Sequence, residues 1–213
     1  MKPFSQFLTG LFLILMLAEV THAQSYQITS VQAIGAGCPQ GSVSATLAPD
    51  LSAISILFDR FSVSTNKGMQ SAYLVKKSCH FVFGVNVSPG YNLEATTLQY
   101  RGFAQLPNSV TATIATSGPI MQTSRFRPNA NMVSTVIGSM IDNFFVEQKI
   151  FQDFKNSCQQ QTKIEFDTNI QLNGKQNRFT MIFPEDSQLV IDSLDSGPSS
   201  SAIELGIRLT PCH

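Results

Sequence analysis

CHFVFGVNV, the stretch from Cys79 to Val87, decides the fold class. Apolar residues or cysteine occupy every second position of this stretch, and mostly polar or small residues stand between them. Successive side chains of a β-strand point to opposite faces of the sheet, so the alternation predicts a strand with one buried and one solvated face. The pattern recurs at Ile164–Leu172 and Ile203–Leu209, and in shorter form at Val43–Leu47, Ile54–Phe58, Val110–Ile114 and Phe179–Phe183.

Turn-forming residues separate these alternating stretches. They are Ala48–Asp50, Ser88–Gly90, Leu106–Asn108, Asn173–Lys175 and Ser196–Ser201. The Asn-Gly pair of the fourth turn tolerates the positive φ of a tight turn, which favours a hairpin there. Short strands separated by turns, without alternating long helices, predict an all-β fold, namely an antiparallel β-sandwich of the immunoglobulin-like or jelly-roll-like kind.

One segment, Asn131–Cys158, fits two interpretations. Met140, Ile141 and Phe144 have the partial i, i+3, i+4 spacing of an amphipathic helix. Gly138 and the β-branched residues before it disfavour a helix, because both residue types lower helix propensity. The pattern alone leaves helix and strand open.

The N-terminal residues have the layout of a secretory signal peptide. Lys2 supplies a positive charge, Phe7–Ala18 is an apolar run, and Thr21–Ala23 offers small residues for cleavage. A transmembrane helix needs about 20 apolar residues, which is more than this run provides. We predict a signal peptide over residues 1–23, a single secreted domain over residues 24–213, and no membrane span after cleavage.

The charge balance argues against a nucleic-acid partner. The chain carries 14 basic and 14 acidic residues, so it has no basic excess to neutralise phosphates. Only 13% of its residues are charged, compared with about 25% in average proteins. With the signal peptide, this composition predicts a secreted protein in an extracellular or periplasmic location.

Four cysteines remain after the signal peptide: Cys38, Cys79, Cys158 and Cys212. An even number in an exported chain indicates disulfides, and four cysteines allow three pairings. A zinc site needs closely spaced pairs, whereas the gaps here are 41, 79 and 54 residues. We therefore predict two disulfides, no metal site and no cofactor.

The glycines Gly35, Gly37 and Gly41 raise the question of a phosphate-binding loop. Their spacing is one residue too long for a dinucleotide fingerprint, and a strand pattern follows where that fingerprint needs a helix. No lysine follows Gly41, which excludes a Walker loop. The stretch instead predicts a turn that Cys38 fastens to another strand.

Two longer stretches carry a family resemblance. GAGCPQGSVSATLAPDLSAISILFDRF (Gly35–Phe61) and VKKSCHFVFGVNVSPGYNLEATTLQYRGF (Val75–Phe103) resemble the signatures of the secreted domain-of-unknown-function family 4360. The resemblance implies a secreted all-β domain with four cysteines, and it favours a strand around Phe144–Ile150. It implies no activity.

Within these motifs, two polar residues are candidates for ligand binding. Asp59 stands in ILFDRF, and Arg101 stands between two aromatic residues in YRGF, where arginine often stacks on a ring or braces a loop by bidentate hydrogen bonds. Tyr91 and Tyr100 are candidate platforms for a sugar ring. The histidines remaining after the signal peptide, His80 and His213, are too few and too far apart in sequence for a catalytic triad or a three-histidine metal site to be expected.

The first functional hypothesis is a non-catalytic secreted or cell-surface module with a binding or structural role. Its partner is unknown, with an extracellular glycan or a surface protein as candidates. The alternative is a secreted hydrolase that acts on polysaccharide through paired carboxylates, so the question of catalysis stays open with a preference for none. With one disulfide in each half of the chain, we predict the pairs Cys38–Cys79 and Cys158–Cys212.

Overall fold

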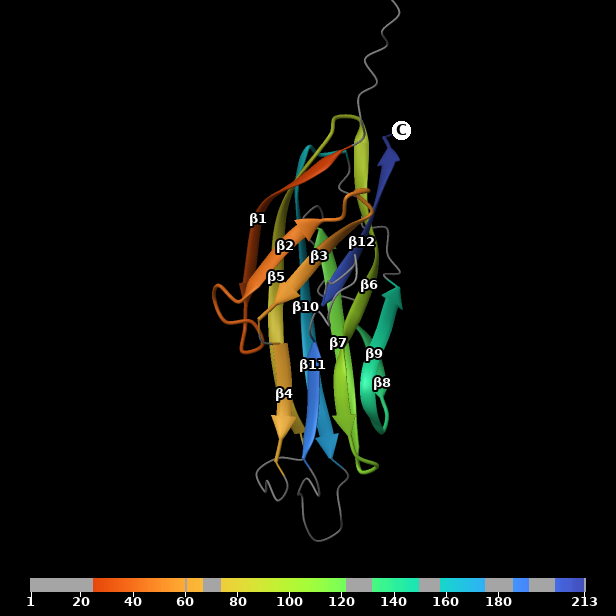
Figure 1. Cartoon of the computed structure of the whole chain (residues 1–213). Coiled ribbons are helices and arrows are strands. Elements are labelled where there is room, and N and C mark those ends of the chain that lie inside the picture. Colours follow the sequence, from red (N-terminus) through yellow and green to blue (C-terminus); the bar gives the residue numbers. More distant parts are fainter. Residues whose placement is uncertain are drawn as a thin grey trace, which may run out of the picture.

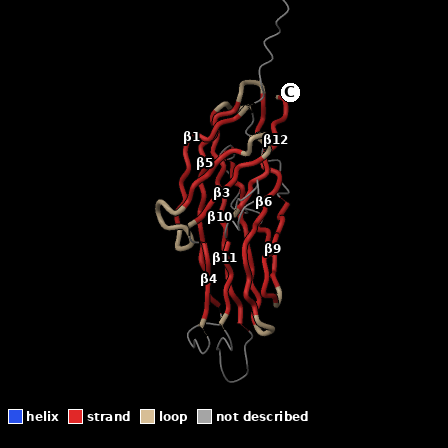
Figure 2. Tube along the Cα trace, in the orientation of Figure 1, coloured by secondary structure: helices blue, strands red, loops and turns tan. Residues whose placement is uncertain are grey.

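The computed structural model describes residues 25–59, 61–66, 74–121, 132–149, 158–174, 186–191 and 202–212. The predicted signal peptide and the predicted strand Phe179–Phe183 lie outside these residues. Every regular element in the described part of the chain is a β-strand (Figure 2). No helix there is long and apolar enough to cross a membrane.

The described strands form two antiparallel sheets, which confirms the predicted all-β sandwich (Figure 1). The five-stranded sheet has the order β1 (Tyr26–Ile34), β5 (Leu74–Val87), β10 (Gln161–Gly174), β7 (Val110–Met121) and β8 (Met132–Ile137). The seven-stranded sheet has the order β2 (Val43–Leu47), β3 (Ala53–Phe58), β12 (Ile203–Pro211), β6 (Tyr91–Leu106), β11 (Ser187–Ile191) and β4 (Phe61–Thr65), with β9 (Met140–Lys149) also paired to β6.

The ambiguous segment forms strands in its described part. β8 lies at one edge of the five-stranded sheet, and β9 pairs with β6 of the other sheet. The helical alternative is therefore wrong for residues 132–149. The β-branched residues of β8 and the alternating burial of Phe144, Val146 and Gln148 suit a strand with one buried face.

The core lies between the sheets and follows the predicted alternation. The inward residues of β5, β10 and β12 are buried at every second position. Aromatic rings dominate the interior: Phe81 of β5 lies 4.8 Å from Phe166 of β10 and 5.7 Å from Phe58 of the opposite sheet, measured between ring centroids. Rings at these separations add about 1 kcal/mol each to the hydrophobic gain of their burial.

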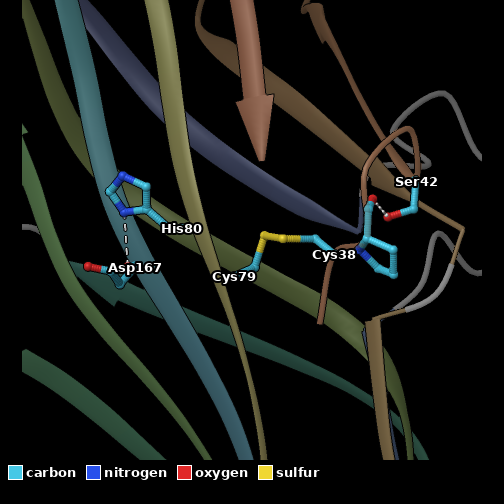
Figure 3. The surroundings of a disulfide bond; sticks show 6 residues. Cys38, Ser42, Cys79, His80 and Asp167 are labelled. Atoms are coloured by element: carbon cyan, nitrogen blue, oxygen red, sulfur yellow. Dashed lines mark hydrogen bonds and ion pairs between the residues drawn. A yellow bond between two sulfur atoms is a disulfide. The ribbon is translucent and has the colours of Figure 1, made fainter. Parts of the chain in front are cut away.

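Both disulfides form in the predicted pairing, and each connects parts of the two sheets. Cys38, in the loop from β1 to β2, is bonded to Cys79 of β5 (Figure 3). Cys158, before β10, is bonded to Cys212, after β12. In the loop-entropy account, closing loops of these lengths stabilises the fold by about 4 kcal/mol each.

The glycine-rich turn owes its composition to close packing. The Gly37 amide donates to the Ser78 carbonyl at 2.9 Å, next to the Cys38–Cys79 disulfide. A methyl group at Gly37 would lie 2.3 Å from the Phe61 ring, so no larger residue fits without movement. The prediction of a turn fastened by Cys38 is confirmed.

The two ends of the described chain meet one turn. The hydroxyl groups of Ser25 and Ser88 are hydrogen-bonded at 2.9 Å, and the Ser88 amide donates to the Ser25 carbonyl. The Cys212 amide donates to the Gly90 carbonyl at 2.8 Å. The Ser88–Gly90 turn, between β5 and β6, therefore holds both ends at one end of the sandwich (Figure 1).

Candidate functional site

The four candidate ligand residues of the sequence analysis do not come together in one site. Asp59 is exposed in the turn from β3 to β4, where its amide donates to the Ser42 carbonyl. Tyr91 is the first residue of β6 and is half-buried against the core. Tyr100 and Arg101 are neighbours in β6, so their side chains point to opposite faces of the sheet.

Tyr100 points into the core and joins the two sheets. Its side chain is fully buried, and its hydroxyl is hydrogen-bonded to Thr116 of β7 and to Thr168 of β10, the latter at 3.0 Å. Burial raises the pKa of Tyr100 to about 12, because the phenolate would lose its hydration. Tyr100 is therefore a core residue, and its side chain is not accessible to a ligand.

Arg101 lies on the outer face of the seven-stranded sheet. Its guanidinium carbon is 5.3 Å from the ring centroid of Phe145, the residue paired with it on β9. This distance is within the range of a cation–π contact, so the predicted ring stacking is confirmed. Phe145 still exposes 56% of its surface.

Polar side chains, among them the Glu147 carboxylate, surround this pair. The Arg101 face, as we call it, consists of outward residues from the middle of β6 and β9: Gln99, Arg101, Phe103, Gln105, Asn143, Phe145 and Glu147. Gln99 donates to the Glu147 carboxylate at 3.1 Å. The face thus joins exposed aromatic surface to amide and carboxylate groups that are held across strands.

The outer face of the five-stranded sheet contains a different feature. Ser30 of β1 pairs with Gly84 of β5, and Gly84 pairs with Lys163 of β10. Since glycine has no side chain, the Ser30 and Thr29 hydroxyls lie close over buried Gly84, and a hollow of about 410 Å³ lies beside them. We call it the Gly84 well; its polar lining includes Thr29, Ser30, Asn86, Gln161 and Lys163.

The well was not identified from the sequence, although the glycine inside the strand pattern was a signal for it. A glycine inside a strand pattern often marks a bulge or a close approach of another group. The structure has such an irregularity in β1, between Ile28 and Ser30, directly opposite Gly84. The partners of Gly84 lie far away in the chain, and no pattern within one strand identifies them.

The comparisons with known proteins give a family. The family described as "Domain of unknown function (DUF4360)" matches residues 24–192. The chain belongs to this family. A protein of Arthroderma benhamiae, described as an uncharacterized secreted protein, is 29% identical over 79 residues, which are 37% of this chain and 32% of that relative. The match therefore spans about a third of the relative's length.

Two solved structures are similar to this DUF4360 chain in a general way. One is the carbohydrate-binding module TmCBM61 in complex with beta-1,4-galactotriose, with 8% identity, a TM-score of 0.29, and coverage of 86% of this chain and 89% of that one. The other is the enzymatically active domain of tailspike protein 4 of bacteriophage CBA120, with 12% identity, a TM-score of 0.21, and coverage of 79% and 19%. Neither likeness supports a conclusion about function.

The disulfides and the secreted relative agree on the compartment of this DUF4360 protein. Disulfides persist in oxidising surroundings outside the cytoplasm, and both pairs are formed here. The protein is secreted, to an extracellular or periplasmic location.

The ionisable groups of this DUF4360 chain are arranged for structure. His80 and Asp167 form a half-exposed pair across β5 and β10, with Nδ1 and Oδ1 separated by 3.0 Å (Figure 3). Glu94 is a buried carboxylate that accepts hydrogen bonds from Arg208 and Thr210 on the neighbouring strand. Within the described residues, no cluster of three or more His, Cys, Asp or Glu side chains could hold a metal ion.

Proposed function

We propose that the protein is a non-catalytic extracellular binding module that recognises a glycan on the Arg101 face. The observation that supports this most is the exposed Phe145 ring, held by Arg101 and bordered by Gln99, Asn143 and Glu147. A sugar ring has an apolar face of C–H groups and an edge of hydroxyls. An aromatic surface suits the first, and amide and carboxylate groups suit the second.

The surface hollows support binding rather than catalysis. Three hollows have no carboxylate among the described residues that line them: the Gly84 well, a second hollow between Val31 and Val43, and a third formed by Leu106–Ser109 and Ser139–Ile141. A glycosidase needs two carboxylates on either side of the bond that it cleaves.

One arrangement supports the hydrolase as a second candidate. Glu147 of β9 and Glu204 of β12 lie on either side of Gln99 in one row of the seven-stranded sheet. Two strand spacings separate their backbones by about 10 Å, close to the range of about 6.5–9.5 Å for the carboxyl groups of inverting glycosidases. Release of reducing sugar that is lost in both Glu147→Gln and Glu204→Gln would favour this alternative.

We also propose that export removes residues 1–23 and leaves one domain from Gln24. N-terminal sequencing of the secreted protein should then begin at Gln24. A protein that begins elsewhere would contradict the cleavage site, and a retained Met1 would contradict the signal peptide.

The test of the glycan proposal is binding to a panel of neutral oligosaccharides. Phe145→Ala should weaken binding by about tenfold or more, because it removes the aromatic surface. Val136→Ala is the matched control, since Val136 is also exposed, by 64%, but lies on β8 of the other sheet. If the wild-type protein binds none of these glycans, or if Phe145→Ala binds as well as the wild type, the proposal fails.

A further inference from the structure

We propose that the Gly84 well is a second binding site, which takes the anionic group of an acidic sugar residue. The carboxylate or sulfate would contact the Lys163 ammonium, and the sugar hydroxyls would contact the surrounding amides and hydroxyls. This site lies on the five-stranded sheet, whereas the Arg101 face belongs to the seven-stranded sheet. The two proposals therefore stand or fall separately.

The register of three strands builds the well. β1 has an irregularity between Ile28 and Ser30, so Thr29 and Ser30 both border the position of Gly84. A methyl group at Gly84 would lie 2.5 Å from the Ser30 hydroxyl and 2.7 Å from the Thr29 hydroxyl. The missing side chain thus lets the Thr29 and Ser30 hydroxyls lie over buried Gly84, where they border the well.

The next row of the sheet closes one side of the well. Asn86 of β5 pairs with Gln161 of β10, and both side chains are exposed on the same outer face as Lys163. The volume of about 410 Å³ lies within the range of small-ligand sites, which is about 300–1,000 Å³. The hollow is therefore large enough for one sugar residue.

Most polar groups of the well have no partner among the described residues, whereas Gln159, which also lines it, does have one. Within the described residues, Lys163 forms no ion pair, and the side chains of Thr29, Ser30, Asn86 and Gln161 form no hydrogen bonds. None of the described residues that line the well is a carboxylate, so the Lys163 charge is available to an anion. Glu165 lies two residues further along β10 on the same face, which favours an anion placed on the Asn86 side of Lys163.

A surface lysine alone would not make such a site, and Lys76 provides the comparison. Lys76 lies on the same outer face of β5, is exposed, and pairs with Gln171 of β10. It has a similar charge and exposure but does not line the well. Lys76→Gln is therefore the matched control for Lys163→Gln.

The experiment measures binding of the full secreted protein, with both disulfides formed, to three oligosaccharides. Oligogalacturonate carries carboxylates, a heparin oligosaccharide carries sulfates, and a cello-oligosaccharide is neutral. We expect binding of at least one acidic probe. Lys163→Gln should weaken this binding about tenfold or more, because a charged hydrogen bond is lost, while Lys76→Gln should change it by less than about twofold.

Two further measurements locate the site. The backbone amide signals of Ser30 and Gly84 should shift in NMR spectra when the bound acidic probe is added. Asn86→Ala, which changes only an exposed side chain, should also weaken binding, while urea unfolding shows that the fold is retained.

Three results would overturn the proposal. They are failure of the wild-type protein to bind either acidic probe, equal affinity of Lys163→Gln and the wild type, and equal weakening by Lys76→Gln. Loss of cello-oligosaccharide binding in Phe145→Ala, with acidic binding retained, would show that the two sites are separate.

Discussion

The outer faces of the two sheets use their polar side chains in different ways. On the Arg101 face, side chains already contact one another: Arg101 stacks on Phe145, and Gln99 donates to Glu147. Around Gly84, the polar side chains of Ser30, Asn86 and Lys163 have no partners in the part of the chain that the structure describes. A face whose groups hold one another is ordered before a ligand arrives, whereas a face of unengaged groups keeps its hydrogen-bonding capacity for a ligand.

The two sheets also contain glycines of different kinds, and the largest expected effect tests this difference. A methyl group at Gly102, beside Arg101, would lie 1.9 Å from the Val190 carbonyl oxygen of β11. Because backbone must move to accommodate it, Gly102→Ala should lower the free energy of unfolding by about 3 kcal/mol.

Gly84→Ala is the matched variant for this prediction. Its two close contacts are the Ser30 and Thr29 hydroxyls, which can rotate away, so its cost should stay within about 1 kcal/mol. Urea unfolding of both variants measures the difference. Equal losses would contradict the distinction between a packing glycine and a glycine that leaves a well.

The next effect concerns the hydrogen bonds of the Tyr100 hydroxyl, which connect the two sheets. Tyr100→Phe would leave the buried hydroxyls of Thr116 and Thr168 without their tyrosine partner. We expect a loss of about 1–3 kcal/mol in the free energy of unfolding at neutral pH. A loss below this range would mean that packing alone aligns the sheets.

The same tyrosine predicts a pH dependence. Its pKa rises from 10.0 to about 12 on folding, so between these values the unfolded chain loses a proton that the folded chain keeps. Stability should be unaffected by Tyr100 below pH 10 and should fall by about 1.4 kcal/mol per pH unit above it, until the folded pKa is reached. Between pH 9 and pH 11, the free energy of unfolding should fall less in Tyr100→Phe than in the wild type. The loss of stability that remains in the variant is expected from Tyr26, because burial raises the pKa of Tyr26 as well.

The smallest effect is expected at the cross-strand pair on the five-stranded sheet. The side chains of His80 and Asp167 are 41% and 42% exposed, so water screens their attraction. Asp167→Asn should change the free energy of unfolding by about 0.5 kcal/mol or less. A larger loss in the free energy of unfolding would show that side-chain pairs stabilise the outer face of the five-stranded sheet as well as the Arg101 face.

The sequence predicted what depends on one strand at a time. Alternation identified the buried sides of β5, β10 and β12, and the cysteine pairing followed the two halves of the chain. The motif around Arg101 predicted stacking on a ring, but the ring is Phe145, which β9 brings from another part of the chain.

Features that depend on register between distant strands were not predictable. The Gly84 well needs Ser30, Gly84 and Lys163 in one row, and no spacing in the sequence encodes that row. Tyr100 was a candidate for the surface because tyrosine suits both environments, and its position opposite Thr116 and Thr168 decides for the core. The ligand roles of Asp59 and Tyr91 stay predictions.

The single turn that holds Ser25 and Cys212 has a consequence for how the domain can be arranged in space. A chain that enters and leaves at neighbouring points can be inserted into a loop of a host protein, or tethered at one point, without stretching across the sandwich. Fusion partners attached at either end would therefore be held near the Ser88–Gly90 turn, and the distant end of the sandwich would project away from them (Figure 1). Such a geometry suits display on a fibre, a bead or a cell.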